Sequence, residues 1–406
     1  MSPPRAPAPH RPQVGARPPH AVHVLGGGDG DGSEAPSAGT AAHVRSLATG
    51  LAARGVRVTV CARYDAGLLH AFTGTGADFL PVQGRNRAEK VAWLRAVCAD
   101  ADLVHAHGLH AGLLAALALG RRRRTVPLVV TWHTLPRPRP GEATRAGAAR
   151  ELVGRLLIRR VARAATVVLG TTTALVDAAR RSGARDARLA PAPIPVEGAT
   201  HHPGEESEDE EEALRHKARA GLGALDRPLL LAVGRLDGSG GHETVLTASR
   251  AWRRLDPPPL LALAGEGPQR AALQRRIDQE GLPVRLLGRR DDALRLLAGA
   301  DLALLPTECR GRSLVAQEAL RHGVPLVAAD GGCVPELAGD AAVLVPGGDA
   351  DSLASAVLTL LADPDRRAAL AEAGRARART WPTEDDASAQ VLSVYDEVRS
   401  AAGAAR

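Results

Sequence analysis

Short apolar runs alternate with amphipathic stretches through the first half of the chain. The intervening stretch Ala41–Arg54 carries Val44, Leu47 and Leu51 at helical spacing and is followed by Gly55, a common helix stop signal. Uninterrupted apolar runs are typical of parallel strands that are buried on both faces. The pattern predicts one doubly wound α/β domain. Its expected strands are Ala21–Leu25, Val56–Cys61, Leu103–His105, Leu128–Thr131 and Thr166–Leu169.

The same alternation begins again in the second half and predicts a second doubly wound domain. The last amphipathic stretch, Ala387–Val398, places Val391, Val394, Tyr395 and Val398 on one face, and that face needs a surface to pack against. The expected strands of the second domain are Leu229–Val233, Leu260–Ala264, Val284–Leu287, Leu302–Leu305, Leu326–Ala329 and Ala342–Val345.

The length of 406 residues also favours two domains, because single cores rarely grow that large. Between the two series lie a proline-rich stretch at 190–196 and the acidic run Glu205–Glu212, which we interpret as a solvated insertion in a linker. The expected organisation is a disordered segment over 1–20, a first domain over 21–196, a linker over 197–226, a second domain over 227–382 and a C-terminal helix over 383–406.

Composition narrows the functional classes. Aromatic residues make up only 2% of the chain, which removes the stacking surfaces of a single-strand nucleic-acid binder, and no nucleic-acid partner is expected. The net charge of +7 comes almost wholly from arginine. The four cysteines are far apart and form no C-x-x-C pair, so neither a zinc site nor a disulfide framework is indicated. With no signal-like or membrane-spanning run in the sequence, we expect a cytoplasmic protein.

Marked sequences follow four of the predicted strands in the second domain. In open parallel sheets ligands collect at these carboxyl ends, where helix N-termini favour anions. Each sequence also has a simpler reading: Gly265 and Gly267 can form a plain strand-to-helix turn before Pro268, and Arg235 can form a surface ion pair. The sequences are Gly234-Arg235-Leu236, Gly265-Glu266-Gly267-Pro268, Gly288-Arg289-Arg290 and the long segment from Gly311 to Glu336 that contains Ser313, Leu314, Glu318 and Asp330-Gly331-Gly332.

Together and in this order, these segments resemble the donor half of the family 4 retaining glycosyltransferases. The resemblance extends over about residues 20–382. It implies the GT-B fold, two Rossmann-like domains facing each other across a cleft, with a terminal helix that crosses back to the first domain. It also implies transfer of a sugar, with retention, from a nucleoside diphosphate sugar to a sugar, lipid or small-molecule acceptor, without a cofactor or a metal.

The resemblance assigns roles residue by residue. Gly234, Arg235, Gly265 and Gly267 match the diphosphate-binding loops, and Arg290 matches the position whose backbone meets the nucleobase. Ser313, Leu314 and Glu318 belong to the helix whose glutamate accepts the ribose hydroxyls; the same carboxylate could instead only complement the helix dipole. In the first domain, Gly39 matches the glycine loop that faces the donor phosphate. His133, in Thr131-Trp-His133-Thr, matches the histidine that reaches the sugar or acceptor, although a histidine at a strand end is often a structural donor.

Two positions depart from the family pattern. Gly240 stands where relatives carry a lysine that neutralises the departing diphosphate, and Arg310 replaces a glutamate that contacts the sugar. Because Arg310 returns positive charge, it is a further catalytic candidate beside His133 and Arg235. Three hypotheses stay open. The chain is a transferase in which other cations neutralise the diphosphate, a degenerate member that binds nucleotide or a protein partner, or a nucleotide-sugar epimerase of similar architecture.

Three other features carry weaker expectations. His105 and His107 lie two apart on a predicted strand without an evident third ligand, and we interpret them as cleft lining rather than a metal site. The pair Asp29 and Asp31 is interpreted as part of a flexible loop that binds no metal. The cluster Arg121–Arg124 is either a solvated loop or a weak peripheral contact with anionic lipid at the inner membrane face.

Overall fold

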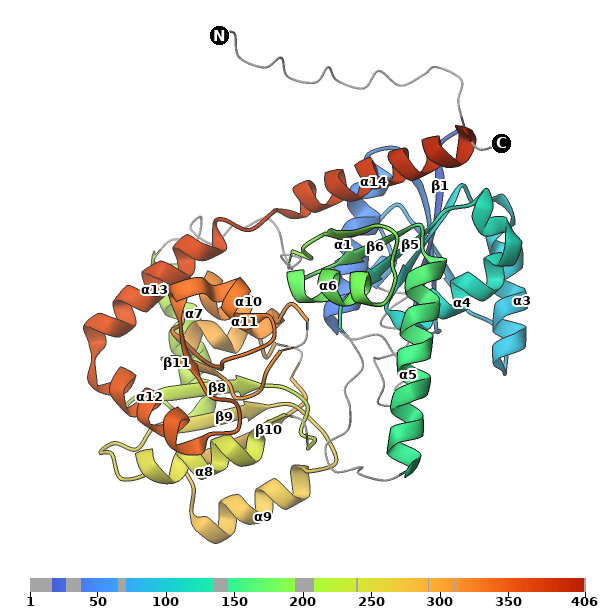
Figure 1. Cartoon of the computed structure of the whole chain (residues 1–406). Coiled ribbons are helices and arrows are strands. Elements are labelled where there is room, and N and C mark those ends of the chain that lie inside the picture. The colour runs from blue at the N-terminus through green and yellow to red at the C-terminus, as the bar shows by residue number, and fades with distance from the viewer. Residues whose placement is uncertain are drawn as a thin grey trace, which may run out of the picture.

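The computed structural model describes residues 17–26, 38–64, 71–134, 145–193, 208–238, 240–290, 292–309 and 311–404. Arg310, Asp29 and Asp31 lie outside these described residues. Two parallel sheets organise the chain, and their carboxyl edges face each other (Figure 1).

The first domain is built on a seven-stranded parallel sheet in the order β3-β2-β1-β4-β5-β6-β7. In this order the chain moves outward from β1 to β3, returns to the centre at β4 and then moves outward to β7. This reversal is the topological switch point of a doubly wound fold, beside which ligand sites form. The strands are β1 (His20–Leu25), β2 (Arg57–Ala62), β3 (Asp78–Pro81), β4 (Leu103–His107), β5 (Leu128–Trp132), β6 (Val167–Gly170) and β7 (Ala187–Leu189).

Helices cover both faces of this sheet. One face packs on α1 and on the last helix of the chain, and the other packs on α3, α4, α5 and α6. Leu47 and Leu51 of α1 are buried, as the helical spacing in the sequence predicted. The helices are α1 (Ala38–Ala53), α3 (Arg87–Val97), α4 (Leu109–Leu119), α5 (Arg145–Ala164) and α6 (Thr173–Arg181), with short 3-10 segments at η1 (Cys98–Asp100) and η2 (Gly120–Arg124).

The second domain repeats this plan with a six-stranded parallel sheet in the order β10-β9-β8-β11-β12-β13. Its two faces form separate apolar cores, one under α7, α10 and α11 and the other under α8, α9 and α12. The strands are β8 (Leu229–Val233), β9 (Leu260–Ala264), β10 (Val284–Gly288), β11 (Leu302–Leu305), β12 (Leu326–Ala329) and β13 (Ala342–Val345). The helices are α7 (Glu208–Leu222), α8 (His242–Trp252), α9 (Arg270–Glu280), α10 (Leu314–Arg321), α11 (Val334–Ala338), α12 (Ala350–Ala362) and α13 (Pro364–Ala378), with η3 (Arg295–Gly299) and η4 (Gly339–Ala341).

The two doubly wound sheets confirm the predicted fold class. All predicted strands are present, and their ends differ from the expected ones by at most two residues. The prediction missed β3 and β7, the two edge strands of the first sheet. Both are short and only partly buried, so neither carries the continuous apolar run that identified the central strands.

The segment expected to be a linker contains a helix that the sequence analysis did not foresee. Helix α7 begins at Glu208, so the second half of the acidic run lies in its first turns instead of in an irregular insertion. Its C-terminal part packs on the second sheet, where Leu222 and Ala224 belong to the core. Arg219 holds the helix in place by donating to the Asp301 carboxylate at 2.8 Å.

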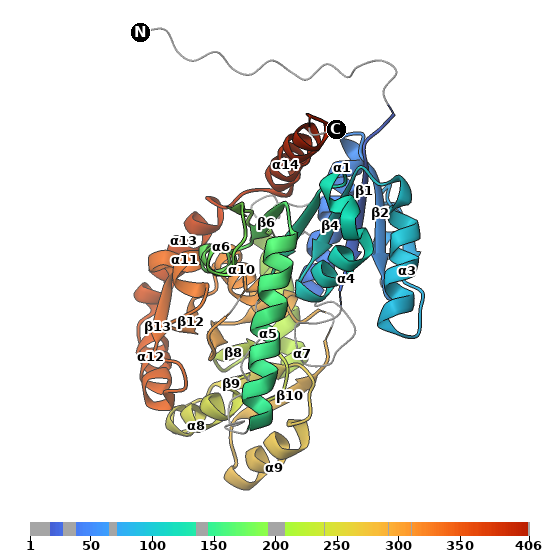
Figure 2. The same cartoon turned by 45° about the vertical axis from the view of Figure 1, so that its right-hand side comes forward.

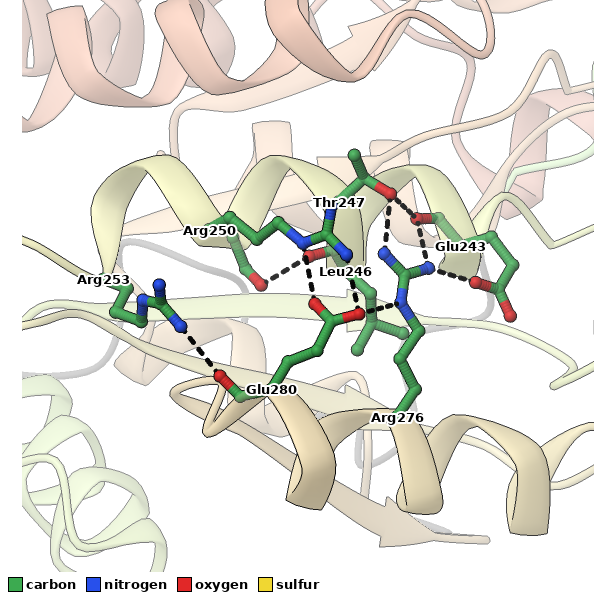
Figure 3. A network of polar contacts seen from close by, with 8 residues as sticks. Glu243, Leu246, Thr247, Arg250, Arg253, Arg276 and Glu280 are labelled. Atoms are coloured by element: carbon green, nitrogen blue, oxygen red, sulfur yellow. Dashed lines mark hydrogen bonds and ion pairs between the residues drawn. The ribbon is translucent and has the colours of Figure 1, made fainter.

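Helices α8 and α9 are joined by a network of charged side chains (Figure 3). The Glu280 carboxylate accepts two hydrogen bonds from Arg250 at 2.7 Å and one from Arg276 at 3.0 Å. Arg276 reaches back to Glu243 and to the Thr247 hydroxyl. Hydrogen bonds from Arg250, followed by those from Arg276, lower the pKa of Glu280 to about 2. The network keeps the two helices in register over the outer part of the second sheet.

The last helix, α14 (Glu384–Ala404), leaves the second domain and packs on the first (Figures 1 and 2). Val391, Val394, Tyr395 and Val398 are buried in the core that also contains Leu47 and Leu51 of α1. Polar contacts line its edges, where Ser46 donates to Glu384 at 2.6 Å and Arg188 donates to Glu397 at 2.6 and 2.7 Å. The apolar face noted in the sequence therefore finds its partner in the first domain.

We expect Val394→Ala to lower the free energy of unfolding by about 1–3 kcal/mol, because it leaves a cavity between α14 and α1. Chemical denaturation followed by circular dichroism measures the change. Ser393→Ala is the matched control on the exposed side of the same helix, with an expected change of less than about 0.5 kcal/mol. Equal effects of the two substitutions would show that this face of α14 does not stabilise the fold.

Candidate functional site

The two sheets approach each other through the loops at their carboxyl edges. A β-carbon at Gly311, in the second domain, would overlap the carbonyl oxygen of His133, which follows β5 in the first. Gly39, near the start of α1, lies against Leu314, the first residue of α10; a β-carbon at Gly39 would be 3.0 Å from its side chain. The structure thus brings together Gly39, His133 and Leu314, three residues of the predicted site.

The glycines of the second domain allow neighbouring loops to pack backbone against backbone. A β-carbon at Gly265 would overlap the carbonyl oxygen of Gly234, and one at Gly267 would overlap that of Leu236. Hydrogen bonds connect the same loops, from Gly234 N to Ala264 O at 3.0 Å and from Leu236 N to Glu266 O at 3.0 Å. Loop packing therefore requires both glycines, apart from any contact with a ligand.

A cavity of about 220 Å³ opens beside these loops, between the ends of β8 and β11. Gly234, Arg235 and His242 line it, together with Thr307. The Arg235 side chain is 64% exposed and lies 3.3 Å from the Asp237 carboxylate, so its guanidinium can reach an anion in the opening. A larger cavity, about 360 Å³, lies between the start of β4 and the end of α14 and contains none of the predicted site residues.

His242 fills the space beside Gly240. A β-carbon at position 240 would overlap the His242 imidazole and come within 2.6 Å of the Arg235 carbonyl oxygen. His242 is 3% exposed, and its Nε2 lies 2.7 Å from that same oxygen. Its Nδ1 is buried without a partner among the described residues. A side chain at 240 could be accommodated only if this imidazole moved.

Helix α10 follows the loop after β11. Ser313 caps it, and the serine hydroxyl accepts a hydrogen bond from Ala316 N at 3.2 Å. Glu318 lies in the second turn and is 8% exposed. Its carboxylate is 3.4 Å from His322 Nε2 and 3.8 Å from Arg321 Nε. Glu318 is therefore a largely buried carboxylate whose neighbours, Arg321 and His322, are about one turn further along the helix.

Arg290 follows β10, and its guanidinium forms two hydrogen bonds with Asp292 at 2.7 and 2.6 Å. These bonds lower the pKa of the Asp292 carboxyl. Gly288, at the end of the same strand, accepts from Gly265 N at 2.8 Å, which joins this loop to the glycine loop after β9. The Arg290 backbone remains a predicted base contact.

The loop after β12 packs against the loop after β11. Gly332, at a φ of 62°, pairs with Cys309, and Cys333 N donates to Cys309 O at 2.8 Å. The thiols of Cys309 and Cys333 both approach the carbonyl oxygen of Gly311, at 2.9 and 2.7 Å. The Glu308 side chain lies over Gly331, where a β-carbon would be 2.7 Å from its Cγ. These contacts hold the segment before α10 against the second sheet.

Glu336 connects the two domains directly. Its carboxylate accepts hydrogen bonds from the backbone N of Thr173, at 3.1 and 3.3 Å, and from the Thr173 hydroxyl. Thr173 is the first residue of α6 in the first domain, so the carboxylate also complements the positive end of a helix dipole. This bond closes one side of the interface between the sheets.

Behind His133 lies a buried cluster of polar rings. His107 Nδ1 is 3.4 Å from His133 Nε2, and His107 Nε2 is 3.2 Å from His23 Nδ1. His23 Nε2 is 3.0 Å from the Tyr395 hydroxyl, which is 2.6 Å from His105 Nδ1. The cluster occupies the sheet face that α1 and α14 cover, and it reaches from the core to the half-buried His133.

The interpretation of His105 and His107 as cleft lining is wrong. His105 is fully buried and His107 is 2% exposed, because α14 covers this face of the sheet. A third histidine, which the sequence analysis did not find, is also present: His23 pairs in register with His105 on the neighbouring strand. Two sets of three ring nitrogens lie within 4.8 Å of one another, His23 with His105 and His107, and His43 with His107 and His133.

Burial keeps these imidazoles neutral. Desolvation lowers the pKa of His23 to about 3, with a smaller contribution from His43, and lowers that of His43 to about 4. It likewise lowers the pKa values of His105, His107 and His133. The cluster therefore offers hydrogen-bond donors and acceptors at neutral pH, and no positive charge.

Sequence reasoning missed His23, His43, His242, Thr173 and Tyr395. Strand alternation could have placed His23 and His105 on one face, had the register of β1 and β4 been foreseen. His43 follows Gly39 by one helical turn, which is a detectable spacing. The roles of Tyr395 and Thr173 depend on contacts between distant segments, for which the sequence has no local signal.

Two family models match the chain and meet near the boundary between its domains. Residues 38–195 match "Glycosyl transferase 4-like domain", and residues 215–377 match "Glycosyl transferases group 1". A D-inositol 3-phosphate glycosyltransferase from Xylanimonas cellulosilytica is 33% identical over 307 residues, which is 72% of this chain and 71% of that relative. The chain therefore belongs to the glycosyltransferase family that these models describe.

A second relative agrees with this assignment, and a solved structure shares the fold. A GDP-mannose-dependent alpha-(1-6)-phosphatidylinositol monomannoside mannosyltransferase from Mycolicibacterium smegmatis is 35% identical over 209 residues; the match spans 48% of this chain and about half, 54%, of that relative. The crystal structure of Anabaena HepE in complex with UDP has a TM-score of 0.72 at 20% identity and covers 93% of this chain and 99% of that one. This structural likeness supports the GT-B fold.

None of the helices within the described residues is both long and apolar enough to cross a membrane.

The neutral cluster predicts acid sensitivity. His23 and His43 take up protons near pH 6.5 when unfolded and only near pH 3 and 4 in the fold, so their contribution to stability is complete above pH 6.5 and is lost as the pH falls toward 4. Between pH 6.5 and 4 we expect the free energy of unfolding to fall by about 1.4 kcal/mol per pH unit for each such histidine. Chemical denaturation at several pH values measures this slope.

His43→Gln removes one titrating group from the cluster. Its free energy of unfolding should therefore fall less steeply with decreasing pH than that of the wild type, by about 1.4 kcal/mol per pH unit. His216→Gln, in α7 and outside the cluster, is the matched control and should leave the slope unchanged. An unaltered slope in His43→Gln would contradict the assignment of a neutral buried imidazole at position 43.

Proposed function

We propose that this chain transfers a sugar from a nucleoside diphosphate sugar to an acceptor hydroxyl with retention of configuration. One observation supports this most directly: the loops after β8, β9 and β10 and the start of α10 converge on one edge of the second sheet, opposite Gly39 and His133. The names of the relatives agree, since one is described as GDP-mannose-dependent and HepE was crystallised with UDP.

In this proposal Arg235 holds the diphosphate, Glu318 accepts the ribose hydroxyls and His133 contacts the sugar or the acceptor. The bond between the anomeric carbon and the diphosphate oxygen breaks, and the acceptor oxygen bonds to that carbon on the same face. The acceptor proton passes to the departing phosphate oxygen, so no separate base is required. The electron pair of the broken bond leaves with the diphosphate, whose charge needs preorganised partners. The chemistry needs no metal or cofactor.

The position of His242 supports a rearrangement, and not a loss, of the groups that bind the diphosphate. The family lysine is replaced by Gly240, and the imidazole of His242 occupies the adjoining space beside Arg235. This ring lines the cavity and has one nitrogen without a partner among the described residues. We infer that Arg235 and Arg310 supply the positive charge for the diphosphate in place of the missing lysine, and that the His242 ring lines the cavity beside Arg235.

The alternative is a degenerate member that binds nucleotide or a protein partner without turnover, and its support is the departure at positions 240 and 310. Incubation with a panel of nucleoside diphosphate sugars, with and without acceptors, separates the hypotheses. Transfer with an unchanged anomeric configuration, read by NMR of the product, supports the proposal. Nucleotide binding without any turnover supports the degenerate member, and conversion of the sugar without an acceptor supports an epimerase.

We expect Glu318→Ala to weaken binding of a nucleoside diphosphate by about 10- to 150-fold, because the ribose hydroxyls lose a charged acceptor worth ~1.5–3 kcal/mol. Isothermal calorimetry measures the affinity, and a chelator should leave it unchanged. Glu372→Ala is the control, since Glu372 also pairs with an arginine three residues later but lies on α13, away from the cavity. Equal affinities in wild type and Glu318→Ala would remove Glu318 from the site.

Helix α5 favours an acceptor at an anionic lipid surface over a free sugar. Its side chains Leu152, Val153 and Leu156 are 58%, 54% and 54% exposed. Leu152 and Leu156 lie one turn apart, and exposed Arg159 and Arg163 continue the same face. Apolar side chains flanked by arginines match a membrane surface. In Figure 2 the helix runs vertically across the front of the view, with its lower end extending beyond the first sheet.

The cluster Arg121–Arg124, which suggested this contact from sequence, is partly engaged within the fold. Arg122 donates to the backbone oxygens of Cys98 and Ala99, and Arg123 donates to that of Gly120. We therefore assign the peripheral membrane contact to α5.

We expect Leu152→Asp with Leu156→Asp to reduce binding to vesicles of phosphatidylglycerol and phosphatidylcholine by about tenfold or more, because both leucines lose their apolar burial in lipid. Co-sedimentation measures binding. Leu225→Asp, which is also at an exposed leucine but in the second domain, should bind as the wild type does. Equal binding of all three proteins, or none by the wild type, would exclude α5 as a lipid contact.

A further inference from the structure

A continuous chain of hydrogen-bonding groups passes through Tyr395 of the C-terminal helix and ends at His133, which lies against Gly311 of the second domain. It begins at the Thr131 hydroxyl, 2.7 Å from His105 Nε2, and passes through the Tyr395 hydroxyl, His23 and His107 to His133. From His105 onward, the successive contacts measure 2.6, 3.0, 3.2 and 3.4 Å. Tyr395 is the one member of this chain that α14 supplies.

Neutral imidazoles restrict how protons can be arranged along this chain. Each neutral ring has one N–H donor and one lone-pair acceptor, and each hydroxyl can donate once. In the interior, His23, His105 and His107 use both ring nitrogens within the chain. We take each contact to contain one hydrogen-bonding proton and require that the Tyr395 hydroxyl donates within the chain. Only two arrangements of the donors along the chain then remain. In one, all donors point from His133 toward Thr131, and in the other all point the opposite way.

The two arrangements differ at the residue that faces the cleft. In the first, His133 Nε2 carries a proton and donates to His107, which leaves Nδ1 as the acceptor of the ring. In the second, His133 Nε2 accepts, and the proton is on Nδ1. The tautomer of His133 is therefore coupled to the direction in which the Tyr395 hydroxyl donates, although Tyr395 lies in the core and is 1% exposed.

We propose that Tyr395 is a positioning residue of the candidate site, whose hydroxyl completes the chain and fixes the tautomer and ring orientation of His133. This inference rests on the proposed function only in its consequence for turnover; the coupling itself is a property of the fold. The domain crossing of α14 thereby gains a second role, since the same helix that ties the domains together completes the polar network behind the cleft.

A metal at the same cluster is a less favourable explanation of these residues. His23, His105 and His107 could offer three nitrogens, but all six of their ring nitrogens already have partners at 2.6–3.4 Å. An ion would have to displace the Tyr395 hydroxyl or a neighbouring imidazole, which would leave a buried polar atom without a partner. The hydrogen-bonded chain satisfies every ring nitrogen without an ion.

The test uses the full chain with ring-15N-labelled histidine in wild type, Tyr395→Phe and Val398→Ala. Long-range 1H–15N spectra distinguish Nδ1–H from Nε2–H tautomers, and His133→Gln identifies the His133 signals. Phenylalanine keeps the ring and removes only the hydroxyl. Val398→Ala weakens the packing of the same helix without touching the chain, so it reports on a purely structural effect.

We expect one dominant His133 tautomer in wild type and in Val398→Ala, and a mixture or a reversal in Tyr395→Phe. If the transferase is active, kcat should fall about threefold to tenfold in Tyr395→Phe while KM for the donor changes less, as expected for the loss of one hydrogen bond that orients a reacting group. Thr131→Val removes the hydroxyl at the end of the chain opposite His133 and should change the His133 signals in the same way. This variant serves as the test if Tyr395→Phe does not fold.

Unchanged His133 tautomers in both Tyr395→Phe and Thr131→Val would overturn the proposal, whatever the activity. Added zinc or cobalt that binds stoichiometrically and shifts the wild-type histidine signals would also overturn it, in favour of a metal site. Absence of turnover in wild type would contradict the proposed function but not the coupling, because the tautomer measurement does not depend on catalysis.

Discussion

The return of α14 to the first domain is the constraint on which the arrangement of the two sheets depends. An amphipathic helix must bury its apolar face, and the face formed by Val391, Val394 and Val398 is buried in the core that α1 and the strands of the first sheet share. Because α13, the helix before it, packs on α10 of the second domain, the chain is anchored on both sides of the interface. The bond from Thr173 to Glu336 fixes a second point. These two attachments hold the two domains against each other.

The same docking imposes a polar requirement, because it covers strands that carry histidines. Buried polar groups destabilise a fold unless they are hydrogen-bonded, and β1 and β4 present three imidazoles to the face that α14 closes. Tyr395 meets this requirement by bridging His23 and His105. An apolar residue at this position would pack equally well but would leave two ring nitrogens without partners. The choice of tyrosine follows from the strands beneath it.

Sequence patterns predicted the fold well because buried parallel strands are marked by their own composition. The runs that became β8, β9, β11, β12 and β13 needed no knowledge of their neighbours. The edge strands β3 and β7 were not predicted, because partly exposed strands lack continuous apolar runs. The prediction for the acidic run at the start of α7 was wrong for another reason. The charge of the run suggested a solvated loop, whereas the apolar residues that anchor this segment, Leu222 and Ala224, lie well after the acidic run.

The sequence motifs nominate candidate site residues, but they do not predict the partners of those residues. Arg235 follows β8, His133 follows β5 and Glu318 lies in α10, so the three candidates come from separate parts of the chain. Gly265 and Gly267 show the difference: the sequence indicated room for a diphosphate, whereas the structure shows that the loops themselves need the room.

His242 is a second case in which packing explains a feature of the sequence. A lysine at position 240 would carry a permanent charge on a flexible stem, but the backbone of Arg235 and the imidazole of His242 leave no space for its β-carbon. The imidazole instead contacts the Arg235 carbonyl oxygen through Nε2 at 2.7 Å. The glycine at position 240 and the histidine at position 242 are therefore parts of one packing arrangement, because the ring occupies the space that a side chain at 240 would need.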